Sequence, residues 1–125
     1  MTGTAEQTLT GKTALVTGAV RRSGRATALE LAKYGASIAI NTRQSVDEAN
    51  LVKTELEALG VKAGVFICDV TNEQDVADMV AKISEELGPV DILVNNAADR
   101  GRVKTLDLSL DEFRRIVAII LEGAF

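Results

Sequence analysis

The chain has 125 residues, of which 46% are hydrophobic and 26% are charged, so it is long enough for one globular domain with a core and unlike a disordered segment. Its formal net charge of -4 and its lack of histidine exclude a broad basic surface for nucleic acid and any imidazole acid/base or metal chemistry. A single cysteine, Cys68, excludes a disulfide framework and a cysteine-based zinc site within one chain.

Residues 1–11 are predicted to form a polar N-terminal tail without the apolar stretch of a secretion signal. No later segment reaches the roughly 18 consecutive apolar residues of a membrane span. We therefore expect a cytoplasmic protein with no membrane partner, no nucleic-acid partner and no metal site.

Short apolar runs rich in β-branched residues predict parallel strands buried on both faces. These runs are Thr13–Val16, Ser37–Ile40, Val65–Cys68 and Ile92–Val94. Segments with helical periodicity lie between them, at Ala26–Tyr34, Val46–Leu59 and Glu73–Leu87. A last helix is predicted from Ser109 to the end of the chain, and its lack of a stop signal indicates that it is cut there.

Local signals mark the ends of the predicted helices. A hydroxyl residue stands three positions before a Glu or Gln, as in a capping box, at Ser45/Glu48, Thr71/Gln74 and Ser109/Glu112. Helix stops are predicted at Gly35, Gly60 and Gly88.

This alternation of strands and helices predicts an α/β fold, the first half of a doubly wound parallel sheet with strand order 3-2-1-4. In such a sheet, ligands bind at the carboxyl ends of the strands, beside the first strand.

The turn after the first strand reads Thr17-Gly18-Ala19-Val20-Arg21-Arg22-Ser23-Gly24. Gly18 allows a tight bend, Gly24 allows close contact between helix and strand, and the free N–H groups at the helix start are suited to a pyrophosphate. A plain βα turn with two glycines is the alternative, and the position after a first apolar strand favours the nucleotide. A phosphate loop at Gly11-Lys12 is rejected, because Glu6 stands where its first glycine is required.

The second predicted strand ends at Asn41-Thr42-Arg43, without the carboxylate that usually accepts a hydrogen bond from the ribose of NAD. Arg43, Arg21 and Arg22 are expected to converge on a 2′-phosphate, which favours NADP(H) over NAD(H). Solvated surface arginines are the alternative, and for Arg25 that alternative is preferred.

Two further segments follow strands at the same edge. Asp69-Val70 is suited to an adenine, and the alternative for Asp69 is a turn former ahead of the Thr71 cap. Asn95-Asn96-Ala97 lies beside the same crevice, where its amides alternatively satisfy backbone groups.

Together, the glycine turn, Asp69-Val70 and Asn95-Asn96-Ala97 strongly resemble the short-chain dehydrogenase/reductase family, from about Lys12 onward. The resemblance implies that Asp69 and Val70 contact the adenine, and that Asn95, Asn96 and Ala97 contact the ribose near the nicotinamide. It assigns the pyrophosphate and the 2′-phosphate to Gly18, Arg21, Arg22, Ser23, Gly24 and Arg43. Arg22 and Ala98 each stand where the family usually has glycine.

By this resemblance, residues 12–125 are an incomplete dinucleotide-binding Rossmann half-domain that is truncated in the family's fifth helix. The family's catalytic Ser and Tyr-x-x-x-Lys have no counterpart. The single tyrosine, Tyr34, has Ile38 four positions later, and Ile120 stands where the family often has a catalytic Asn. No catalytic residue is predicted, and the chain alone is expected to be inactive.

The resemblance implies the cofactor-binding portion of an NADP(H)-dependent oxidoreductase that reduces a carbonyl of a small molecule. The stretch Asp91–Ala97 resembles 3-oxoacyl-[acyl-carrier-protein] reductases, whereas the glycine turn resembles a pteridine-reductase-like branch. The intact protein is expected to be a homo-oligomer. The alternative is a non-catalytic nucleotide-binding or protein-interaction module, motivated by the apolar residues Ile116, Val117, Ile119 and Ile120.

Overall fold

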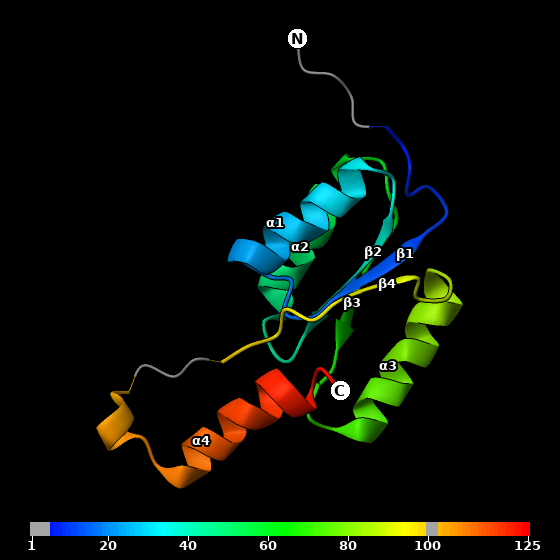
Figure 1. The fold of residues 1–125 in the computed structure, drawn as a ribbon. Coiled ribbons are helices and arrows are strands. Elements are labelled where there is room, and N and C mark those ends of the chain that lie inside the picture. Colours follow the sequence, from blue (N-terminus) through cyan, green and yellow to red (C-terminus); the bar gives the residue numbers. More distant parts are fainter. Residues whose placement is uncertain (1–5, 100–102) are drawn as a thin grey trace.

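The computed structural model of the chain describes residues 6–99 and 103–125. Its strands form one parallel sheet in the order β3-β2-β1-β4, as predicted. The strands are β1 (Thr13–Val16), β2 (Ser37–Thr42), β3 (Ala63–Ile67) and β4 (Ile92–Val94). All of them run in the same direction, so their carboxyl ends meet at one edge (Figure 1).

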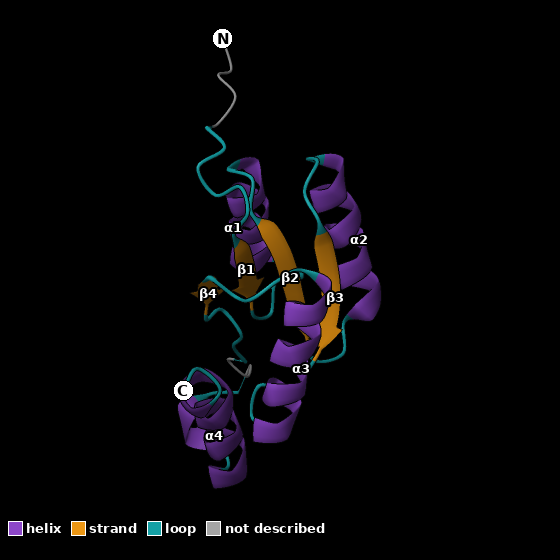
Figure 2. Ribbon diagram, turned by 90° about the vertical axis from the view of Figure 1, so that its right-hand side faces the viewer, coloured by secondary structure: helices purple, strands orange, loops and turns teal. Residues whose placement is uncertain are grey.

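The connecting segments are helical. They are α1 (Arg22–Lys33), α2 (Val46–Ala58), α3 (Glu73–Glu86), a short 3-10 turn at Thr105–Asp107, and α4 (Leu110–Val117), which continues as a π-helical segment over Ala118–Glu122. α1 and α2 cover one face of the sheet and α3 covers the other (Figure 2). None of the described helices combines the length and the apolar character needed to cross a bilayer.

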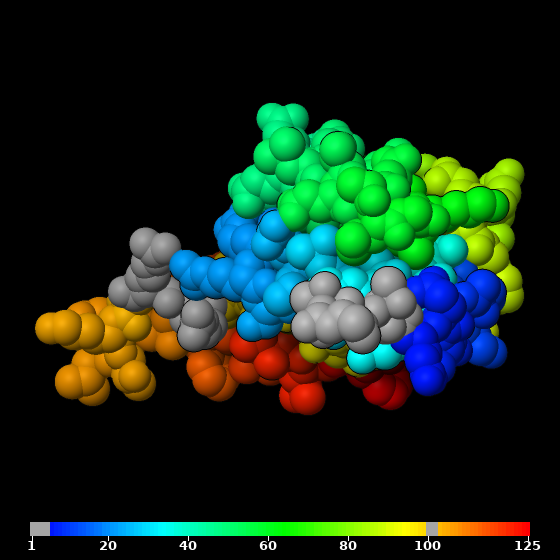
Figure 3. Space-filling model, turned by 90° about the horizontal axis from the view of Figure 1, so that it is seen from above, coloured from blue at the N-terminus to red at the C-terminus, as the bar shows by residue number. Residues whose placement is uncertain are grey.

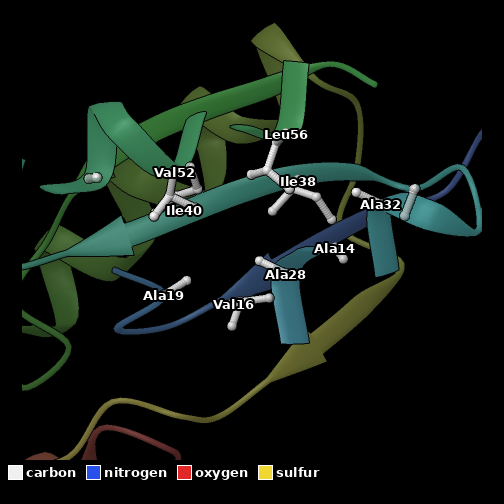
Figure 4. Packing of buried hydrophobic residues seen from close by; sticks show 11 residues of the cluster. Ala14, Val16, Ala19, Ala28, Ala32, Ile38, Ile40, Val52 and Leu56 are labelled. Atoms are coloured by element: carbon white, nitrogen blue, oxygen red, sulfur yellow. The ribbon is translucent and has the colours of Figure 1, made fainter. Parts of the chain in front are cut away.

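The core lies mainly between the sheet and the α1–α2 layer (Figure 4). Fully buried strand residues such as Ile38 and Ile40 contact α2 through Val52 and Leu56. α1 contributes the small side chains of Ala28 and Ala32, which let it lie close to the sheet. On the opposite face, a smaller cluster joins the sheet to α3 and contains Leu15, Ala39, Phe66, Cys68, Met79 and Ile83.

The prediction that all the strands are buried on both faces is correct for β1 and β2 and wrong for β3 and β4. Ile67 in β3 is 63% exposed and Leu93 in β4 is 54% exposed. The physical reason is position, since β3 and β4 are the two edges of this sheet. Leu93 is paired with the buried Leu15, but it lies beyond the part of this face that α3 covers.

The helix ends are predicted correctly in part. Ser109 forms the full capping box with Glu112, and Gly35, Gly60 and Gly88 lie in the left-handed conformation after α1, α2 and α3. The box at Thr71 is wrong, because Asn72 is the residue that caps α3, with its side chain accepting from the N–H of Asp75. Ser45 precedes α2 as predicted but makes no capping hydrogen bond.

α4 differs from the other helices because none of its residues is buried. The segment that leads into it projects from the body of the molecule (orange in Figure 3). The ion pair between Arg115 of α4 and Asp99 ties the helix to the segment after β4. Of the apolar residues expected on its surface, Ile120 is exposed, whereas Ile116, Val117 and Ile119 are half-buried.

Candidate functional site

A cavity of about 680 Å³ opens at the carboxyl ends of β1, β2 and β3. Nearly all the residues predicted for the site line it, namely Gly18, Arg21, Arg22, Ser23, Gly24, Arg43, Asp69, Val70, Asn96 and Ala97. Asn95 lines a second cavity of about 160 Å³, which it shares with Val70, Asn96 and Ala97 of the first cavity. The larger cavity is also lined by residues that were not predicted for the site, among them Ser45, Asp99 and Ile119.

The glycine turn is a region of close backbone contact. Gly18 has a φ of +62°, and a Cβ atom there would lie 3.1 Å from the Cα of Ala97. At Gly24, a Cβ atom would lie 2.4 Å from the side-chain nitrogen of Asn96 and 2.8 Å from the carbonyl oxygen of Gly18. Glycine is therefore needed at both positions, because the segment after β4 packs directly on the turn.

Hydrogen bonds lock this segment to the turn. The Asn96 Nδ2 group donates to the carbonyl oxygens of Thr17 and Gly18, at 3.0 and 3.1 Å. In return, the Thr17 hydroxyl oxygen accepts from the backbone N–H groups of Asn96 and Ala97, both at 2.9 Å. The side-chain nitrogen of Asn96 thus satisfies backbone carbonyl groups of the turn.

Asn41, which was not predicted as a site residue, forms a hydrogen bond with the same turn. Its side chain is buried, and its Oδ1 atom accepts from the N–H of Gly18 at 3.3 Å. Its Nδ2 group donates to the carbonyl oxygens of Phe66 and Cys68, at 3.3 and 3.1 Å. The signal in the sequence is an amide side chain at the end of an apolar strand. A buried polar side chain requires hydrogen-bond partners, so Asn41 marks a position where other groups must meet it.

The start of α1 faces the cavity and suits an anion. Arg21 precedes the helix in an extended conformation, and no side chain caps the first turn. N–H groups at a helix start carry partial positive charge and bind phosphates readily. Arg22, the first residue of the helix, adopts the left-handed conformation with a φ of 49°. The start of α1 therefore offers backbone N–H groups to an anion in the cavity.

The predicted arginines do line the same cavity, but one of them is already paired. Arg21 donates its Nε and Nη2 groups to the carboxylate of Glu48, each at 3.0 Å, and Nη2 also donates to the hydroxyl of Ser45 at 3.2 Å. Arg25 does not line the cavity, and its side chain, which is 42% exposed, pairs with Glu55 of α2. The first pair links the residue before α1 to α2, and the second links α1 to α2.

Asp69 is a turn former as well as a cavity residue. Its Oδ1 atom accepts from the N–H of Thr71 at 2.9 Å and from the Thr71 hydroxyl at 2.6 Å. These hydrogen bonds, with a smaller contribution from the charge of Arg43, lower the pKa of Asp69. The carboxylate is thus held ionised and its geometry is fixed beside Val70.

The single tyrosine of the sequence, Tyr34, does not line the cavity. Tyr34 follows the last residue of α1, at the end of the helix opposite to the cavity. Within residues 6–99 and 103–125, no group of three or more His, Cys, Asp or Glu residues is arranged to hold a metal ion. The arrangement as a whole suits binding of a large anionic ligand.

Known proteins resemble this chain in sequence and in fold. A family model described as short chain dehydrogenase matches residues 12–125. The chain is 41% identical over 117 residues to an L-rhamnose 1-dehydrogenase (NAD(P)(+)) from Sphingomonas sp., covering 94% of this chain and 46% of the relative. It is 35% identical over 114 residues to a 3-oxoacyl-[acyl-carrier-protein] reductase from Staphylococcus epidermidis, covering 91% of this chain and 47% of the relative.

A similar solved structure is a short chain dehydrogenase from Burkholderia cenocepacia in complex with NADP. It has a TM-score of 0.85 and 36% sequence identity, with 92% of this chain and 47% of that chain covered. The chain thus spans about half the length of the relatives it matches.

Proposed function

Because the chain belongs to the short-chain dehydrogenase/reductase family, we propose that its larger cavity binds the nicotinamide cofactor of an oxidoreductase and prefers NADP(H) to NAD(H). The observation that carries this proposal is the composition of the cavity wall after β2. Thr42, Arg43, Gln44 and Ser45 line it there without a carboxylate. A carboxylate at this position accepts from the ribose 2′-OH of NAD and repels a 2′-phosphate.

Each wall of the cavity has a role in the proposal. The N–H groups of Arg22, Ser23 and Gly24 at the start of α1 bind the diphosphate, with Gly18 allowing the bend. Arg43, with Arg21 and Arg22, binds the 2′-phosphate through charge-assisted hydrogen bonds. The adenine lies against Asp69 and Val70, and Asn95, Asn96 and Ala97 lie toward the nicotinamide end.

The proposed reaction of the intact protein is reduction of a carbonyl of the 3-oxoacyl type, for which the cofactor supplies hydride when bound. The relative from S. epidermidis bears the name of that reaction, and the relative from Sphingomonas is named for L-rhamnose and for both NAD and NADP. In the proposal, groups outside this chain supply the proton to the substrate oxygen, because Tyr34 lies away from the cavity and Ile120 carries no proton donor. We also propose that the intact protein is a cytoplasmic homo-oligomer.

A titration of the purified chain with NADPH and with NADH tests the cofactor assignment. NADPH is expected to bind at least about tenfold more tightly, a difference of about 1.4 kcal/mol. Arg43→Ala should remove most of this preference and leave NADH affinity unchanged. Lys82→Ala is the matched control, because it deletes the same charge from an exposed position that does not line the cavity.

Equal affinity for the two cofactors, or tighter binding of NADH, would overturn the preference for NADP(H). The same titration addresses a second candidate, a protein-interaction module, which is favoured by the exposed apolar side chains of Leu110, Phe113 and Leu121. Such a module would bind neither cofactor.

A further inference from the structure

We propose that Glu48 weakens recognition of the cofactor's 2′-phosphate by acting as a built-in counter-ion for Arg21, and so sets how strongly the site discriminates NADPH from NADH. This inference rests on the proposed function. The sequence pattern predicts Glu48 only as part of a capping box, whereas in the structure its carboxylate lies against Arg21 of the cavity.

The geometry of Glu48 is that of a partner for Arg21 and not of a helix cap. Its two carboxylate oxygens accept from Arg21 Nε and Nη2 at 3.0 Å each, so they cover one edge of the guanidinium group. Ser45, which should complete the capping box, instead accepts from Arg21 Nη2 at 3.2 Å. The first turn of α2 is thus turned toward Arg21 at the rim of the cavity.

Charge makes this contact a competitor for the ligand. The guanidinium edge covered by Glu48 presents the paired donors that a phosphate also uses. Among the described residues, Arg21 is ion-paired within 4.0 Å, whereas Arg22 and Arg43 have no carboxylate at that distance. A bound 2′-phosphate must therefore displace Glu48 from Arg21 or accept the repulsion of its charge.

The displacement is feasible because the pair is exposed. The side chains of Arg21 and Glu48 are 56% and 51% exposed, and ion pairs in such positions contribute little net free energy. A cofactor without the 2′-phosphate leaves the pair undisturbed. The presence of Glu48 therefore reduces NADPH affinity and leaves NADH affinity unaffected.

The test is Glu48→Gln, which keeps the size of the side chain and removes its charge. At low ionic strength, we expect NADPH to bind the Glu48→Gln variant about threefold to tenfold more tightly than it binds the unmodified chain, with NADH affinity unchanged. Adenosine 2′,5′-bisphosphate should show the same gain, and 5′-AMP should show none. These two fragments isolate the contribution of the 2′-phosphate.

Glu55→Gln is the matched control. Glu55 of α2 forms a similar two-bond pair with Arg25 of α1, and neither residue lines the cavity. The side chains of Arg25 and Glu55 are 42% and 38% exposed. The control variant removes one negative charge from α2, as Glu48→Gln does, so it reports the effect of net charge alone. NADPH affinity should change less in this variant than in Glu48→Gln.

Each other outcome overturns the inference. Unchanged or weaker NADPH binding by Glu48→Gln would show that Glu48 does not compete, or that it orients Arg21 favourably. A gain that persists in the Arg21→Ala background would assign the effect to long-range charge. If the unmodified chain binds neither NADPH nor NADH, the proposed function itself fails, a result distinct from equal NADPH affinities in the unmodified and Glu48→Gln chains.

Discussion

Arg22 shows at the scale of one residue how the site conflicts with backbone preference. It begins α1 in the left-handed conformation, with a φ of 49°, which costs a residue with a Cβ atom about 1–2 kcal/mol. The family that the sequence resembles usually has glycine here. Arg22 lines the cavity, so the strain lies at a position where the proposal places a cation near the phosphate.

Arg22→Gly is therefore expected to raise stability while weakening NADPH binding. Relief of the left-handed strain outweighs the added freedom of glycine in the unfolded chain, for a net gain of about 0.5–1 kcal/mol in the free energy of unfolding. Urea denaturation measures the gain. The control is Ala26→Gly in the exposed interior of α1, which should lose about 1 kcal/mol. Equal losses in both variants would contradict the strain at Arg22.

At the scale of elements, two of the helices begin differently from the prediction. Asn72 caps α3, whereas the predicted caps Thr71 and Ser45 form no capping hydrogen bond. Asn72 accepts from the N–H of Asp75 at 3.0 Å and begins α3. The hydroxyl of Thr71, one residue earlier, donates to Asp69 instead. Ser45 stands at the start of α2, but its hydroxyl accepts from Arg21. The hydroxyl groups of both predicted caps, Ser45 and Thr71, thus form hydrogen bonds with residues of the cavity instead of capping a helix.

Asn72→Ala should lower the free energy of unfolding by about 1 kcal/mol, because the first turn of α3 loses its side-chain acceptor. Ser45→Ala should cost less than about 0.5 kcal/mol, since no capping hydrogen bond is lost. Chemical denaturation of the two variants in parallel provides the comparison. A larger loss for Ser45→Ala than for Asn72→Ala would show that the caps are assigned to the wrong residues.

At the scale of the whole molecule, burial is uneven. One face of the sheet is closed by α1 and α2, and the other is closed by α3 over only part of its width. Cys68 lies within the α3 cluster and is 3% exposed. Burial, with smaller contributions from the charges of Asp75 and Asp69, raises the pKa of its thiol from 9.0 to about 11.

The pKa of Cys68 makes the stability of the fold depend on pH. A thiol whose pKa is raised by folding favours the folded state below pH 9, and this contribution is lost as the pH rises toward 11.

The reactivity of the buried Cys68 thiol also reports opening of the molecule. At pH 8, near the pKa of an ordinary thiol, alkylation by iodoacetamide should be far slower for the native chain than for the chain unfolded in urea. Mass spectrometry of timed samples measures both rates. Similar rates would mean that the α3 layer opens freely.

Much of the fold is determined by the sequence itself. The apolar runs, the helical periods and the glycines after the helices are local patterns, and they predict the elements and, with the handedness of crossovers, the strand order 3-2-1-4. The boundaries are less exact: α1 begins at Arg22 and not at Ala26, because the turn enters the helix directly, and β3 covers Ala63–Ile67 and not Val65–Cys68. The gathering of the glycine turn, Arg43 and Asp69 in one cavity follows from the same topology.

Tertiary structure alone decided which polar groups meet. Asn41 and Thr17 become supports of the glycine turn only when β3 and the segment after β4 lie beside it. Glu48 becomes the partner of Arg21 across 27 positions of sequence. These contacts join residues distant along the chain, and their geometry depends on the packing of whole elements. Local sequence patterns therefore identify the candidate site, whereas the packed fold determines which of its charges are available to a ligand.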